Sequence, residues 1–194
     1  MEECGRLHGH ICPGQLLGVR MALLGCRLID IKDPRGADRK KIIVWVEIDR
    51  CMADAVCAVV GVSLGRRSLK FYDYGKVAAS FLNLTTGKAV RIAALDSSRN
   101  LADVLHQEID SKKERQMRAY SEVRDGDLFK IEFVEINLGE LDMPGHPKKR
   151  VVCSSCGEGI NDGREQVQED GELQCKSCGL NSYYKSSGLI KKTI

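Results

Sequence analysis

Residues 41–61, KIIVWVEIDRCMADAVCAVVG, predict the fold of this chain most clearly. The first eight are mostly β-branched or aromatic, and an apolar run of this length is typical of a buried strand. The small residues of 49–61 favour a closely packed helix directly after that strand. Cys51 falls at the junction between the strand and the helix.

Further helices and strands are predicted on both sides of this pair. Residues 13–24 supply an apolar helical face, Pro13 suits the first helical position because it has no N–H to lose, and Gly25 is a stop signal. Strands are expected over 69–72, 89–95 and 128–136, and helices over 76–82 and from Ser97 or Asn100 to Arg118. This mixed order favours the α+β class, with α/β as the alternative.

A second, smaller domain is expected after residue 145. Residues 143–150, MPGHPKKR, combine two prolines and a glycine with three basic residues, a composition typical of linkers. The predicted domains are therefore residues 1–145 and 148–194. The second has about 45 residues, too few to bury much surface without a further source of stability.

Composition excludes several classes of protein. The 194 residues are 43% hydrophobic and 29% charged, and a net charge of +3 with interspersed signs gives no strong field for nucleic acid or anionic lipid. No apolar run approaches the roughly 20 residues of a membrane-spanning helix, and no export signal opens the chain, so we expect a cytoplasmic protein without a membrane partner. The nine cysteines are expected to be thiols and metal ligands rather than disulfides.

Four of these cysteines form the most specific motif in the chain. Cys153 and Cys156 are separated by two residues, and 18 residues later Cys175 and Cys178 repeat the spacing. Two such pairs bring four thiolates around one metal ion, which predicts a closed, structural zinc site, with redox disulfides or an iron centre as alternatives. Zinc binding would replace the core that the second domain lacks.

A second group of potential ligands surrounds the start of the first long helix. His8, His10 and Cys12 lie within five residues, and Cys51 with Asp54 occupies the start of another predicted helix. Together they predict a second site for zinc or another divalent metal with one position open, and the helix start would favour a thiolate. The alternative is that the histidines are surface residues and the cysteines small buried groups.

The candidate catalytic residues are Cys12, Cys51 and His10. A zinc-bound water or a cysteine thiolate would attack a carbonyl-like carbon, and a histidine would move the proton. Further along, Arg66 lies in a glycine-containing stretch and Lys76 follows Gly75, so both are candidates for holding an anionic ligand. A polar turn is the alternative reading of the segment around Gly75.

The ordered set of these motifs resembles the FmdE family, named after a subunit of formylmethanofuran dehydrogenase, over about residues 4–140. The segments that carry the resemblance are His8-Gly9-His10-x-Cys12-Pro13-Gly14, Gly18-Val19-Arg20-Met21-Ala22, Cys51-x2-Asp54-Ala55, Gly61-x3-Gly65 and Asp73-Tyr74-Gly75-Lys76. The resemblance implies an α+β domain, a homodimer and a zinc-holding cavity, with His10, Cys12 and Cys51 as matched positions and His8, Asp54 and Lys76 as further candidates. At Arg66 and Arg67 the chain departs from the family pattern Gly-Lys-Gly-Asn-Leu. The four-cysteine segment is similar to the DksA/TraR-type zinc finger and implies a zinc ribbon or treble clef.

The function that this resemblance implies is that of a zinc-binding accessory subunit in a larger molybdenum or tungsten enzyme of the formylmethanofuran dehydrogenase type. The isolated chain is not expected to be the redox catalyst, because it has no ferredoxin-type cysteine run and is much shorter than a molybdopterin-binding subunit. Two alternatives remain: a zinc-finger regulator or adaptor that contacts RNA polymerase or nucleic acid, and a thiol redox enzyme that uses Cys12 and Cys51.

Overall fold

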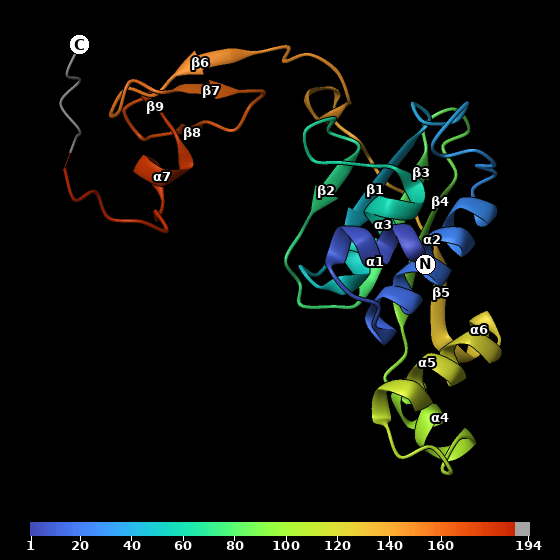
Figure 1. Ribbon diagram of the computed structural model, residues 1–194. Coiled ribbons are helices and arrows are strands. Elements are labelled where there is room, and N and C mark those ends of the chain that lie inside the picture. Colours follow the sequence, from blue (N-terminus) through green and yellow to red (C-terminus); the bar gives the residue numbers. More distant parts are fainter. Residues whose placement is uncertain (189–194) are drawn as a thin grey trace. The chain divides into compact units, whose positions relative to one another are not determined.

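The computed structural model describes residues 1–188. The chain forms two compact units, Met1–Asn137 and a second that begins at Leu138. Figure 1 shows a sheet with helices in the first unit and short strands in the second. The α+β class predicted from the sequence is confirmed.

The first unit is built on a five-stranded sheet with the strand order β2-β1-β3-β4-β5. Its strands are β1 (Ile42–Val46), β2 (Leu69–Phe71), β3 (Ala78–Asn83), β4 (Ala89–Ala94) and β5 (Phe129–Phe133). Only β1 and β2 pair in parallel within this sheet, with Val46 opposite Phe71, and the remaining neighbours are antiparallel. The carboxyl ends of β1 and β2 therefore meet at the same edge of the sheet.

Helices α2 (Pro13–Leu28) and α3 (Cys51–Val60) cover one face of this sheet and form the core with it (Figure 1). The helices of the unit are α1 (Glu2–His8), α2 (Pro13–Leu28), α3 (Cys51–Val60), α4 (Ser97–Leu105), α5 (Lys112–Glu122) and α6 (Asp125–Leu128). Met21 of α2 and Val56 of α3 join the fully buried Val44, Phe81 and Ile92 of the sheet. These apolar side chains supply the main stabilising free energy of the unit.

Helices α2 and α3 approach each other closely because glycine occupies the contact. A Cβ atom on Gly18 would lie 2.7 Å from the Cβ of Ala55 and 2.7 Å from the carbonyl oxygen of Met52. Gly25 has the same role against the sheet, where an added Cβ would lie 2.5 Å from the ring of Phe81. The prediction that Gly25 ends the helix was wrong: α2 continues to Leu28, because glycine is needed there for packing.

Two other sequence predictions were wrong. Residues 78–83 form β3 rather than a helix, since they pair with both β1 and β4 and all six are buried; a fully buried strand has no polar face whose period could reveal it. The single helix expected up to Arg118 is two helices. His106 ends α4 in a non-helical conformation, and the hydroxyl of Ser111 accepts a hydrogen bond from Glu114 N to begin α5.

The second unit consists of short elements. After a 3₁₀ turn, Glu140–Asp142, β6 (Arg150–Val152) pairs antiparallel with β7 (Gly159–Asn161), β8 (Gln166–Val167) pairs with β9 (Leu173–Gln174), and α7 (Lys176–Gly179) follows. Among its described residues only Cys153 and Ile160 are buried hydrophobic residues. A unit with so small a core needs another source of stability. Within residues 1–188, no helix has the length and apolar character required to cross a bilayer.

Candidate metal centre

Three potential metal ligands meet where three helices begin or end. His8 is the last residue of α1, Cys12 is the N-cap of α2 and Cys51 is the first residue of α3. One ligand atom from each lies within 4.8 Å of the others, and all three residues are half-buried. A histidine and two cysteines are a donor set that zinc accepts, and three protein ligands leave one coordination position open.

Glycine allows this approach. Gly9 ends α1 with a left-handed φ of 89°, which turns the chain back so that Cys12 comes near His8. A Cβ on Gly14 would lie 3.3 Å from the Cβ of Cys51, and 3.8 Å and 3.9 Å from the sulfur atoms of Cys51 and Cys12. Gly14 therefore keeps the space beside both sulfur atoms open.

Asp54 lies behind the histidine rather than in the cluster. His8 Nδ1 is 2.7 Å from Asp54 Oδ2, so Nε2 is the ring nitrogen left to bind a metal. The His10 ring lies against the His8 ring, with 4.8 Å between centroids, but His10 is exposed and does not join the cluster. Of the predicted ligands, the structure thus brings together His8, Cys12 and Cys51.

The two thiols of this cluster affect each other. Burial raises the pKa of Cys51 above its usual value, and the neighbouring Cys12 raises it further through a hydrogen bond and charge repulsion. These causes oppose the thiolate that the helix start is expected to favour at Cys51. A cation between the sulfur atoms would remove that repulsion, as in other thiolate metal sites.

The two predicted anion-binding residues lie at opposite ends of β2. Arg66 is exposed in the turn before the strand, whereas Lys76 lies beyond its carboxyl end with Nζ 5.9 Å from the centre of the Tyr74 ring. The backbone N–H groups of Tyr74 and Lys76 both donate to the carbonyl oxygen of Glu47, at 3.1 Å. Lys76 therefore lies beside the carboxyl ends of β1 and β2, where the chain continues into α3. Arg66 lies at the opposite end of β2.

An aromatic pair accompanies Lys76 at this edge. The rings of Tyr72 and Tyr74 are 6.1 Å apart, and both side chains are exposed. The Tyr74 ring lies next to both the Tyr72 ring and the Lys76 ammonium group, so the three exposed side chains form one cluster. Tyr72 was not singled out from the sequence, although its spacing of two from Tyr74 was a usable signal.

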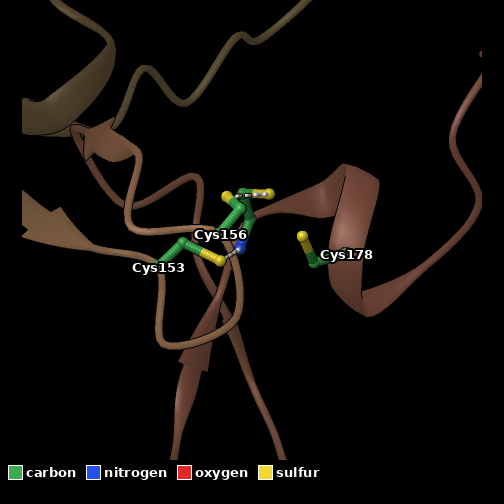
Figure 2. Close-up of side chains that lie close together, drawn as sticks. Cys153, Cys156 and Cys178 are labelled. Carbon is green, nitrogen blue, oxygen red and sulfur yellow. Dashed lines mark hydrogen bonds between the residues drawn. The ribbon is translucent and has the colours of Figure 1, made fainter. Parts of the chain in front are cut away.

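The second unit holds the other cluster. One sulfur atom from each of Cys153, Cys156, Cys175 and Cys178 lies within 4.8 Å of the rest, and Figure 2 shows the labelled side chains turned toward a common centre. Cys153 Sγ accepts a hydrogen bond from Cys175 N at 3.3 Å. Backbone N–H groups of Cys156 and Cys175 lower the pKa of Cys153 to about 6, while the neighbouring thiols of Cys175 and Cys156 raise the pKa of Cys178 to about 12.

These observations define a class: an α+β protein with two clusters of potential metal ligands, one in each compact unit. The chain belongs to the FmdE family, because the family profile described as "FmdE, Molybdenum formylmethanofuran dehydrogenase operon" matches residues 7–131. That match includes all three residues of the first cluster. The resemblance stated from the sequence is confirmed.

Two known proteins are similar to this chain. A protein of Archaeoglobus fulgidus named "Probable S-adenosyl-L-methionine-binding protein" is 29% identical in an alignment 170 residues long, which covers 78% of this chain and 46% of that protein. The chain thus spans about half the length of this relative. The crystal structure of a protein from Syntrophus aciditrophicus that is similar to the FmdE subunit of a tungsten formylmethanofuran dehydrogenase has a TM-score of 0.62 and 24% identity. The match covers 95% of this chain and 92% of that one, and shows the shared fold.

Proposed function

We propose that the first unit binds zinc or another divalent metal through His8, Cys12 and Cys51. The observation that carries this proposal is the convergence of three ligand atoms within 4.8 Å from three separate helices. The fit is supported by the donor set and by Gly14, whose missing side chain leaves room beside both sulfur atoms. A metal held here supplies a Lewis acid with an open position for a ligand.

The residues around the cluster have distinct roles in this proposal. Cys12 and Cys51 supply thiolates, and His8 supplies Nε2 while Asp54 fixes its ring through Nδ1. His10, exposed beside the His8 ring, is placed to exchange a proton between a bound ligand and solvent. Lys76 is the side chain that we expect to contact an anionic group of that ligand.

The cluster of the second unit is proposed to hold a structural zinc ion. Four thiols around one centre leave no position for a substrate, and the small core of the unit gives the metal a folding role. Zinc is the default metal for four cysteine ligands of this spacing.

The metal content of the full chain tests both sites. Mass spectrometry on protein purified without chelators or a histidine tag should find two equivalents in the wild type, and one in both the Cys12→Ser, Cys51→Ser variant and the Cys153→Ser, Cys156→Ser variant. Cys57→Ser, in the same helix as Cys51 but outside the cluster, is the matched control and should keep both. One equivalent in the wild type, with a reversible Cys12–Cys51 disulfide, would instead favour a thiol redox enzyme.

We further propose that the protein is a homodimeric accessory subunit of a formylmethanofuran dehydrogenase-type molybdenum or tungsten enzyme. The family description and the similar Syntrophus protein support this proposal. Affinity purification from the native host should recover the large subunits of such an enzyme, and sedimentation should give twice the 21.5 kDa mass. Recovery of RNA polymerase without those subunits would favour a zinc-finger regulator.

A second candidate function is binding of S-adenosyl-L-methionine, as the name of the Archaeoglobus relative states for that protein. The exposed Tyr72 and Tyr74 rings favour it, because an adenine ring can stack on a tyrosine face. Calorimetric titration should then show saturable binding that Tyr74→Ala weakens and Tyr184→Ala, at a comparably exposed tyrosine of the second unit, does not. Absence of binding would exclude this candidate.

A further inference from the structure

A cavity lies at the other end of the helix pair that carries the first cluster. Helices α2 and α3 run in the same direction, because Gly14 contacts Cys51, Gly18 contacts Ala55, and Leu23 and Val59 line one cavity. Leu23 is 11 residues beyond Cys12 in sequence, which corresponds to about 16 Å along a helix. The cavity is therefore separate from the proposed metal centre.

The cavity has the size and lining of a site for a small molecule. Its volume is about 580 Å³, within the usual range for ligand pockets. Its apolar wall consists of Leu23, Cys26, Ile31, Pro34 and Val59. Burial raises the pKa of the Cys26 thiol to about 12, in keeping with an apolar floor. Leu23 is 59% exposed although it lies in the middle of α2, so its side chain is available to an apolar ligand.

The charged rim of the cavity is already paired, with one exception. Arg27 binds Asp125, Asp30 binds Lys88, and Arg35 binds Glu3. The carboxylate of Asp33 accepts hydrogen bonds from two backbone N–H groups of its own loop, those of Gly36 and Ala37.

Lys32 is that exception. Within the described part of the chain its ammonium group makes no hydrogen bond or ion pair and acts on the Asp30 carboxylate only at longer range. Arg27, Asp30 and Arg35 are already neutralised by the side chains that they bind, so among the described residues Lys32 is the exposed positive charge of the rim without a partner. An anionic group is therefore the one that this rim can complement.

We propose that this cavity binds a small apolar carboxylate, with its aliphatic chain against Leu23 and Val59 and its carboxylate at Lys32. The carboxylate of the ligand pairs with Lys32 and leaves the existing ion pairs of the rim intact. The aliphatic chain of the ligand covers apolar surface of the cavity that otherwise contacts water. Each added methylene in the ligand should therefore tighten binding about two- to fourfold until the cavity is filled.

Calorimetric titration of the metal-loaded, 194-residue chain with octanoate tests this proposal. Hexanoate, octanoate and decanoate should bind with increasing affinity, whereas acetate, which lacks the chain, and octylammonium, which reverses the charge, should bind at least about tenfold more weakly than octanoate. The methyl signals of Leu23, Ile31 and Val59 should shift in NMR spectra as octanoate is added. Shifts confined to other residues, or equal affinity for octylammonium, would overturn the proposal.

Two surface variants separate the apolar and the charged contributions. Leu23→Ser should weaken octanoate binding roughly tenfold and Lys32→Glu roughly threefold to tenfold. Their controls are Leu64→Ser, at a comparably exposed leucine, and Lys40→Glu, at an exposed lysine outside the cavity. All four positions are on the surface, so the fold should survive each change. Octanoate affinity that is the same in wild type and in both cavity variants would refute the assignment.

Discussion

His8 Nδ1 lies 2.7 Å from Asp54 Oδ2 and thereby joins the end of α1 to the first turn of α3. The hydrogen bond determines which ring nitrogen faces the two cysteines. It also places a carboxylate one helical turn beyond Cys51, where it can support the cluster without entering it.

The first prediction concerns this pair. Asp54→Asn should weaken metal binding at the first cluster by about 10- to 100-fold, the usual effect of removing a carboxylate that orients a histidine ligand. Competition with a chromophoric chelator measures the affinity. Asp49→Asn, a nearby exposed carboxylate, is the control and should behave as the wild type. Equal affinities for all three proteins would mean that Asp54 does not support the site.

The second prediction concerns the contact between α2 and α3. Gly18→Ala should lower the free energy of unfolding by roughly 1–3 kcal/mol, because the new Cβ would overlap backbone atoms of Met52. Gly126→Ala is the control, since a Cβ at Gly126 meets nothing within 4 Å. Urea unfolding measures both. A Gly18→Ala variant as stable as Gly126→Ala would contradict the close packing described here.

The third prediction concerns a buried ion pair. Arg91 donates from Nε and Nη2 to both carboxylate oxygens of Glu47, each at 2.7 Å, and the Glu47 side chain is only 8% exposed. Arg91→Gln should destabilise the protein by about 3–5 kcal/mol because it leaves a buried carboxylate without its partner. Adding Glu47→Gln should recover part of that loss. A double variant less stable than Arg91→Gln would show that the unpaired charge is not the cause.

The fourth prediction concerns acid stability. Hydrogen bonds from Lys41 and from the backbone N–H groups of Asp33 and Lys32 lower the pKa of Asp38 from 3.8 to about 2. A carboxyl whose pKa is lower in the folded state stabilises the protein above its unfolded pKa, and this contribution disappears as the pH falls through its folded pKa. The difference in melting temperature between wild type and Asp38→Asn should therefore be constant above about pH 5 and shrink toward pH 2. A difference independent of pH over this range would contradict the lowered pKa.

The fifth prediction concerns metal removal. A chelator such as EDTA should unfold the second unit and leave the first folded, because only the first has an extensive apolar core. In NMR spectra, the signals of Ile160 and Val167 should collapse to unfolded positions while those of Val44 and Ile92 stay dispersed. Retention of the dispersed Ile160 signal in metal-free protein would show that the second unit folds without a metal.

The sequence was informative where local chemistry determines structure. The strand and helix around Cys51 and the start of α2 at Pro13 follow from composition and capping, and both were predicted correctly apart from their ends. The strand β3 was missed because two neighbouring strands, rather than its own pattern, determine its conformation. Spacing alone also cannot show whether His8 or His10 joins the two cysteines. That depends on the left-handed turn at Gly9 and on the hydrogen bond between His8 and Asp54, which are 46 residues apart in sequence.

The absence of a side chain at Gly18 has a thermodynamic consequence. The two helices touch there, with the metal ligands toward their amino ends and the apolar cavity toward their carboxyl ends. The two proposed sites therefore share one pair of helices. If filling the cavity changes metal affinity by some factor, metal binding must change carboxylate affinity by the same factor, and in that case a larger residue at Gly18 should alter both affinities together.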